Sequence, residues 1–296
     1  MNDQVGIPVC FSAEDPVVRP GKRVLMMAYQ TKIADQIRLL TLTWCKNLLL
    51  VSIEEKGEGH SQGKVELKPW YFWKKQGSRH LIVDGKTVEV AWDLRAAKFN
   101  GETEPISDYY VAFVYENEVV LVVGDLKKEA FRKTGCRPAL IDPILVSRKE
   151  HVSGRRKFST RAKFGEKGNF FELSIECKND NGSSNSFDGV DPELEIKIDG
   201  NLALNVKHLQ WKFRGNQSIW VGEIELQVYW DVHDWFFNTN PRHGLFIFIP
   251  IFSSPQLSSL SSLPLSADIA DSALGEKGRH GALSGYCLVI YAWKTA

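Results

Sequence analysis

The sequence predicts an all-β protein made of two tandem, similar antiparallel β-sandwich or half-open barrel modules. Three observations support this prediction. Apolar residues recur mainly with a period of two, and β-branched and aromatic residues dominate the short runs that show this alternation. Turn residues separate the runs at short intervals. A stretch of 27 residues occurs twice in related form.

The expected strands are short and fill most of the chain. They are Val24–Tyr29, Leu40–Trp44, Leu48–Glu54, Val65–Trp73, Val88–Trp92, Tyr110–Tyr115, Val119–Val123, Ile144–Ser147, Phe158–Phe164, Phe170–Glu176, Leu194–Ile198, Leu202–Val206, Ile224–Trp230, Leu245–Ile249 and Tyr286–Trp293. Asp84-Gly85 and Asp199-Gly200 lie between such runs. Each pair predicts a two-residue hairpin turn, because Gly accepts the positive φ that these turns require.

One helix is expected in Gly124–Gly135, with the sequence GDLKKEAFRKTG. Asp125 can cap its amino end and Gly135 can end it. Leu126, Ala130 and Phe131 give it a short apolar stripe. We expect this helix to join the two modules.

The duplication relates residues 73–99 to residues 211–237 by a shift of 138 positions without gaps. Eight of the 27 positions are identical, where ordinary residue usage would give roughly two. Upstream, VSIE at residues 51–54 matches LSIE at 173–176, and VELK at 65–68 matches LEIK at 194–197. The preserved order of these segments indicates two copies of one module.

The repeat predicts three parts. Residues 1–21 form an amino-terminal segment, 22–140 the first module, which ends in the helix at 125–134, and 141–296 the second module. Two insertions distinguish the second copy. Residues 178–192 are polar and predict a loop, whereas residues 253–285 contain a Ser-rich run and predict disorder.

Composition indicates a soluble intracellular protein, expected in the cytoplasm and, as a second location, the nucleus. No signal peptide opens the sequence, and the apolar runs are far shorter than the ~20 residues of a membrane span. Lys and Arg (37) nearly balance Asp and Glu (36), which argues against a nucleic-acid partner. The five scattered Cys residues indicate reduced thiols, and no CxxC pair suggests zinc.

Residues 228–237, VYWDVHDWFF, group two carboxylates and an imidazole among five aromatics. Strand alternation would put Asp231 and His233 on one face and Asp234 on the other, so a metal would need a ligand from elsewhere. Asp231 could instead orient His233 for acid–base catalysis, although no nucleophile motif accompanies them. Because Asp93 occupies the place of Asp231 in the other copy, the repeat favours a turn-capping role for Asp231. His233 and Asp234 lack such counterparts and are the better site candidates.

The basic segment 148–163 could bind phosphate, RNA or an anionic membrane, or act as a nuclear import signal. Between residues 157 and 164, however, apolar and polar side chains alternate. This predicts an amphipathic strand with a solvated basic face that lacks aromatic residues for stacking bases. The turn after Gly154 carries Arg155, Arg156 and Lys157, which are the expected anion contacts.

Trp70 and Phe72 could line a ligand cavity, because neither has a clear counterpart in the second copy. Trp73 pairs with Trp211 in the repeat and is therefore expected in a core. No acidic cluster has EF-hand spacing, and there is no Walker loop and no GxGxxG motif. We expect no metal and no cofactor.

Eight segments resemble a plant-specific family, the domain of unknown function 868. They are IPVCF (7–11), VELKPWYFWKKQGS (65–78), AWDLRAAKF (91–99), GDLKKEAFRKT (124–134), RKEHVSGRRKFSTRAKF (148–164), LQWKFRGNQSIWV (209–221), VYWDVHDWFF (228–237) and LVIYAWK (288–294). The resemblance spans nearly the whole chain. It implies a land-plant source and supplies no activity and no site residues.

The function expected from the sequence is non-enzymatic binding, of a small apolar ligand or of a protein partner. The expectation rests on absent catalytic motifs and on analogy between folds. Two alternatives remain open: an enzyme that uses His233 with Asp231 or Asp234, and an anion or nucleic-acid binder that uses segment 148–163.

Overall fold

The computed structural model describes residues 23–45, 48–55, 61–67, 75–164, 170–178, 192–237, 242–252, 282–283 and 285–294. Strands dominate these residues, so the all-β prediction is confirmed. We call residues 23–138 the first half and residues 144–294 the second half.

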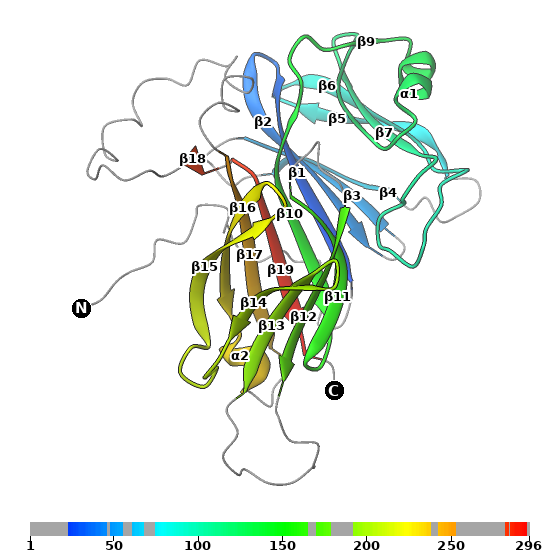
Figure 1. Cartoon of the computed structure of the whole chain (residues 1–296). Coiled ribbons are helices and arrows are strands. Elements are labelled where there is room, and N and C mark those ends of the chain that lie inside the picture. Colours follow the sequence, from blue (N-terminus) through cyan, green and yellow to red (C-terminus); the bar gives the residue numbers. More distant parts are fainter. Residues whose placement is uncertain are drawn as a thin grey trace.

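The largest sheet has ten strands and runs through both halves (Figure 1). Its members are β1 (Val24–Ile33), β2 (Gln36–Cys45), β3 (Leu48–Glu55), β4 (Ser61–Leu67), β10 (Ile144–Ser153), β15 (Arg214–Val221), β16 (Ile224–Asp231), β17 (His243–Phe252), β18 (Ala282–Leu283) and β19 (Cys287–Trp293). Their order is β15-β16-β17-β19-β10-β1-β2-β3-β4, with β18 beside β17. The antiparallel pairing of β1 with β10 joins the halves.

Each half also has a smaller sheet of mainly antiparallel strands. The first contains β5 (Gln76–Val83), β6 (Lys86–Asp93), β7 (Tyr110–Tyr115), β8 (Glu118–Val123) and β9 (Arg137–Pro138), in that order. The second contains β11 (Lys157–Lys163), β12 (Phe170–Lys178), β13 (Glu193–Ile198) and β14 (Asn201–Val206), in that order. Two facing sheets in each half form the two predicted sandwiches.

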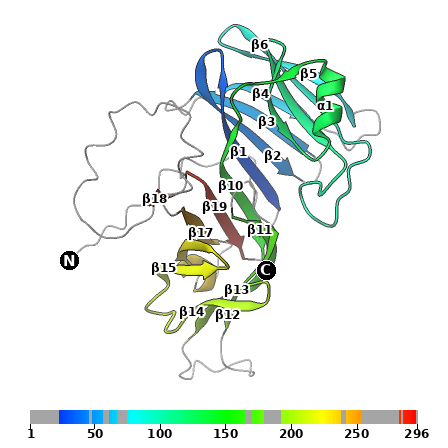
Figure 2. The same cartoon turned by 45° about the horizontal axis from the view of Figure 1, so that its top comes forward.

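Both small sheets pack on the same face of the large sheet. Leu25 on β1 is paired with Glu150 on β10, and Glu150 is paired with Ile290 on β19. Leu25 belongs to the core of the first half, and Ile290 belongs to the core of the second. Because directly paired residues point to the same side of a sheet, the two cores share one face. Glu150 therefore lies between them, where the small sheets stand apart (Figure 2).

The alternation of the sequence explains both cores. On β13, Leu194 and Ile196 are fully buried between half-exposed neighbours. On β2, Leu40 and Leu42 are fully buried against the first small sheet, and Thr41 and Thr43, on the opposite face of the strand, are buried as well. Burying one such side chain contributes about 1.5–3 kcal/mol, so these alternating runs stabilise the sandwiches.

The two predicted hairpin turns are present. Asp84 and Gly85 have φ of 51° and 73°, and Asp199 and Gly200 have φ of 49° and 78°. Both central residues of each turn thus have the positive φ that the twist of a two-residue hairpin demands. The strand expected at Val65–Trp73 is β4, which ends at Leu67, and residues 68–74 lie outside the described residues.

The predicted helix is α1 (Lys127–Thr134), and Gly135 ends it with φ of 68°. The predicted cap was wrong. Leu126 holds the cap position without a side-chain hydrogen bond, and Asp125 Oδ1 instead accepts from the backbone N–H of Tyr109 at 3.2 Å. The expected joining role was also wrong. Ala130 packs with the cluster on the outer face of the first small sheet, away from the contact between β1 and β10.

The two related 27-residue stretches form equivalent hairpins. In β5–β6, Gly77 is paired with Trp92, and in β15–β16, Gly215 is paired with Trp230 at the positions shifted by 138. Each glycine leaves room for the indole ring of its Trp partner. A common origin of the halves stays a prediction, as do the domain limits. Residues 179–191, 253–281 and 284 of the two insertions lie outside the described residues.

Candidate functional site

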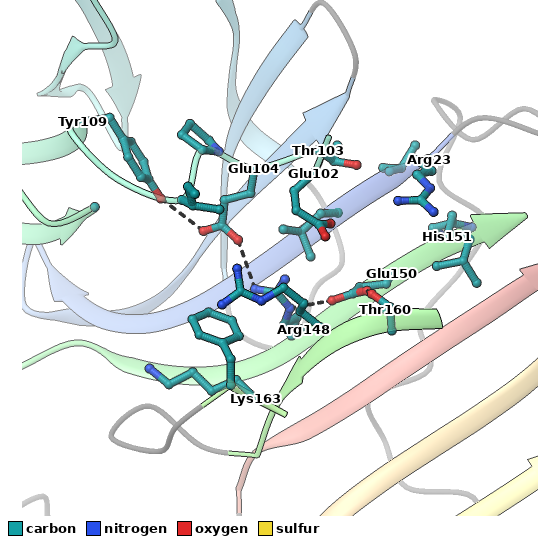
Figure 3. A pocket seen from close by; sticks show the side chains of 18 of the residues that line it. Arg23, Glu102, Thr103, Glu104, Tyr109, Arg148, Glu150, His151, Thr160 and Lys163 are labelled. Atoms are coloured by element: carbon teal, nitrogen blue, oxygen red, sulfur yellow. Dashed lines mark hydrogen bonds and ion pairs between the residues drawn. The ribbon is translucent and has the colours of Figure 1, made fainter. Parts of the chain in front are cut away.

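A polar cleft of about 540 Å³ lies between the two halves (Figure 3). Its floor is formed by β1 and β10, one wall by the loop that contains residues 102–106, and the other wall by β11. It exists because the two small sheets share one face of the large sheet without meeting. Side chains from all three sheets, or from the loops that join their strands, therefore converge there.

A buried ion triad forms the floor of the cleft. Arg148 Nη1 lies 3.0 Å from Glu104 Oε2, and Arg148 Nε lies 2.7 Å from Glu150 Oε1. The three side chains are only 8–18% exposed. Burial alone would lower the pKa of Arg148, but the two carboxylates outweigh this effect and raise its pKa above the ordinary value. The guanidinium is therefore permanently charged, and the triad carries one net negative charge.

Two hydroxyl groups complete the triad. Tyr109 donates to Glu104 Oε1 at 3.1 Å, and Thr160 donates to Glu150 Oε2 at 2.6 Å. Burial and then the Glu104 carboxylate raise the pKa of Tyr109 well above its ordinary value, so the phenol stays protonated and able to donate. Glu104 comes from the first small sheet's loop and Thr160 from β11. The network thus connects all three sheets across the cleft.

The cleft is not predicted by the sequence. The sequence pattern predicts that Arg148 lies in a solvated basic segment and predicts no role for Glu150, because the strand is expected to end at Ser147. In the structure β10 continues to Ser153 between β1 and β19, so Arg148, Glu150 and Val152 face the interior. The sequence feature that could have indicated the cleft was charge on both faces of a long strand, which is exceptional unless the charges are paired.

The amphipathic strand expected after residue 157 is confirmed. On β11, Phe158 and Ala162 are buried, whereas Lys157 and Arg161 are exposed. The expectation that this basic face lacks aromatic residues was wrong, because β12 brings Phe170 opposite Lys163. The Arg161 guanidinium carbon lies 4.6 Å from the centre of the Phe170 ring, which is a cation–π contact.

The predicted candidates Asp231, His233 and Asp234 come together at the end of β16. Strand alternation does not extend past Asp231, contrary to expectation, because α2 (His233–Phe236) begins there. His233 Nδ1 lies 3.0 Å from Asp234 Oδ1, and the three residues line one hollow of about 410 Å³. Each carboxylate also pairs with an arginine, Asp231 with Arg214 at 2.6 Å and Asp234 with Arg242 at 2.9 Å.

Asp231 also binds backbone at the strand end. Its Oδ1 accepts from the N–H of His233 at 3.4 Å, and Asp93 Oδ1 accepts from the N–H of Arg95 at 3.1 Å. The same contact therefore follows both related strands, which is the turn contact that the structural interpretation of Asp231 predicts. A binding role of Asp231 stays a prediction.

Two further histidines, which the sequence does not single out, lie close to the sites. His243 lines this hollow, and burial lowers the pKa of His243 despite the nearby carboxylates. His151 lines the cleft. His151 stacks on Tyr291 with ring centres 4.6 Å apart and accepts a hydrogen bond from Trp293 Nε1 at its Nδ1. Burial, followed by the neighbouring His243, lowers the pKa of His151 to about 4.

The expected anion contacts Arg155, Arg156 and Lys157 lie exposed at the turn between β10 and β11. Two of them have protein partners: Arg156 lies over the Phe236 ring at 5.4 Å, and Lys157 pairs with Glu176 at 3.0 Å. An anion contact at this turn stays a prediction. Trp70 and Phe72 lie outside the described residues, and among the described ones no group of three or more potential metal ligands occurs.

The fold and the cleft define a class: an all-β protein whose two sandwich halves share a central sheet and enclose a charged cleft between them. The chain belongs to a plant protein family of unknown function (DUF868), whose model matches residues 20–294. This match confirms the resemblance seen in the sequence. No curated protein and no solved structure matches the chain. Within the described residues, no helix is both long and apolar enough to cross a membrane.

Proposed function

We propose that this protein is a non-enzymatic binding protein whose small polar ligand occupies the cleft between the halves. The observation that carries the proposal is the hollow of about 540 Å³ with a hydrogen-bonded ion triad on its floor. Ligand sites have volumes of roughly 300–1,000 Å³ and a few convergent polar groups. Charged walls favour a polar ligand in this cleft over the apolar ligand expected from the sequence.

Native mass spectrometry of protein purified from plant tissue tests this function. We expect a bound small molecule in the unmodified protein and its loss from Glu102→Trp, because Glu102 points into the cleft (Figure 3) and an indole there would obstruct it. Glu223→Trp, on the exposed turn between β15 and β16, is the matched control and should keep the ligand. Absence of any bound molecule, or equal retention by Glu102→Trp, would reject the proposal.

A second candidate function is acid–base catalysis at the end of β16. The observation that favours it is the contact of His233 with Asp234 on the wall of a hollow, with the imidazole 51% exposed. A carboxylate in that position can orient an imidazole for proton transfer. Hydrolysis of activated esters and phosphoesters tests it. His233→Ala should abolish turnover while His80→Ala, on the exposed face of β5, should not, and equal rates for both would exclude this function.

A further inference from the structure

The charges that line the cleft are sorted by depth. The inner group holds three carboxylates and one guanidinium. Glu104, Glu150 and Arg148 have side chains only 8–18% exposed, whereas Glu102 is half-buried and also lines a neighbouring, more open hollow with Arg161. The outer group holds three cations and one carboxylate: Arg23, Arg161 and Asp125 are exposed, and Lys163 is half-buried. The cleft is therefore negative inside and positive at its mouth.

We propose that the ligand of this cleft is a zwitterion that points its cationic group inward and its anionic group toward the rim. A short peptide with free termini has this charge pattern and suits a cleft of about 540 Å³. The inference rests on the proposed function and specifies the ligand class of that same site.

The inner group has three carboxylates but only one cation, Arg148. Arg148 is already shared between Glu104 and Glu150, so the triad alone leaves one buried negative charge. Glu102, which is half-buried, adds a second negative charge, and no ion pair between described residues involves it. Uncompensated charge away from water is costly, and an ammonium group between these carboxylates would offset that cost. A charge-assisted hydrogen bond would add to the attraction.

The outer group can hold an anion. Arg161 is exposed and Lys163 is half-exposed on β11, and both flank the Phe170 ring, at 4.6 and 5.8 Å from its centre. Arg23 approaches from the start of β1 at another part of the rim. A carboxylate can bind such cations at the mouth of the cleft, and the half-exposed Phe170 ring offers an apolar contact to the ligand between its ends.

The arrangement of the charges by depth also argues against ligands whose charges all have the same sign. A polyanion would meet three inner carboxylates, and a polycation would meet three basic side chains at the entrance. Like charges at close range cost binding free energy on either route. Only a ligand with both signs in this order is attracted along its whole length.

Binding of a pooled library of tripeptides to the full chain, followed by native mass spectrometry, tests the proposal. Tripeptides with free termini should bind, and the same pool with acetylated amino ends should bind at least about tenfold more weakly, as expected for one lost charged hydrogen bond. Amidated carboxyl ends should weaken binding less, because the rim is closer to water. Equal binding of free and acetylated pools would overturn the proposal, and so would the absence of binding by every tripeptide.

Variants of the protein show where the two ends of the bound peptide lie. Glu102→Gln should weaken the free pool but leave the acetylated pool unchanged, whereas Arg161→Met should weaken the free pool more than the amidated pool. Glu223→Gln and Lys207→Met, on distant exposed positions, are the matched controls. A molecule of another charge class that co-purifies from plant tissue and is lost in Glu102→Trp would overturn the zwitterion while leaving the proposed function intact.

Discussion

At the scale of single residues, His151 links the stability of the fold to pH. It is 8% exposed, stacks on Tyr291 and accepts at Nδ1 from Trp293, so the native state holds a neutral imidazole with its proton on Nε2. Its pKa of about 4 lies below the ordinary value of 6.5. The unfolded chain therefore binds a proton more readily, and the associated stability is present above pH 6.5 and lost as the pH falls toward 4.

The predicted consequence is a fall in the free energy of unfolding of at most about 3 kcal/mol between pH 6.5 and 4 from this residue. His151→Gln keeps an acceptor for the Trp293 N–H but cannot ionise, so its stability should depend less on pH in this window. Urea unfolding at several pH values measures the difference. The control is His80→Gln, at an exposed position, which should keep the wild-type slope. If His151→Gln keeps that slope too, His151 is not the linked group.

At the scale of the element, the β15–β16 hairpin requires a glycine opposite its tryptophan. A Cβ at Gly215 would come within 2.5 Å of Trp230 Cζ2, and Trp230 is fixed by its 6% exposure and by a 3.0 Å hydrogen bond from Nε1 to the Lys212 carbonyl. We predict that Gly215→Ala lowers the free energy of unfolding by about 1–3 kcal/mol, the usual cost of overpacking.

The related hairpin provides the matched control for this prediction. A Cβ at Gly77 would lie 3.1 Å from the Trp92 ring, which needs only a small shift. Gly77→Ala should therefore cost clearly less than Gly215→Ala in the same urea titration. Equal losses for the two variants would show that backbone effects, rather than the approach to the indole, determine the cost.

Strands with an apolar alternation were predictable from sequence, whereas β5 and β15 were not. On β15 only Ile219 is buried, so the exposed polar residues before it show no apolar alternation that would predict a strand.

The VYWDVHDWFF residues were predictable as a group because they are adjacent in sequence. The triad was not, because Glu104 and Arg148 lie 44 positions apart and meet only through the pairing of β1 with β10.

At the scale of the whole molecule, the triad helps to fix the halves relative to each other. Arg148→Met would leave Glu104 and Glu150 buried without their shared cation, so we predict a loss of about 3–5 kcal/mol in the free energy of unfolding. The triple variant Arg148→Met/Glu104→Gln/Glu150→Gln removes the charges together and should recover much of that loss.

The pH dependence of Arg148→Met separates an electrostatic cause from lost packing. Without the guanidinium, burial and mutual repulsion should raise the folded-state pKa of Glu104 and Glu150 above their unfolded values. The two carboxyl groups would then contribute fully to stability only below their pKa in the unfolded chain. The variant should therefore lose stability as the pH rises through their pKa in the folded state. The triple variant cannot titrate at these positions and should lack this loss. Parallel urea titrations between pH 4 and 7 compare them, and a pH-independent deficit in Arg148→Met would mean that packing alone holds the halves at this point.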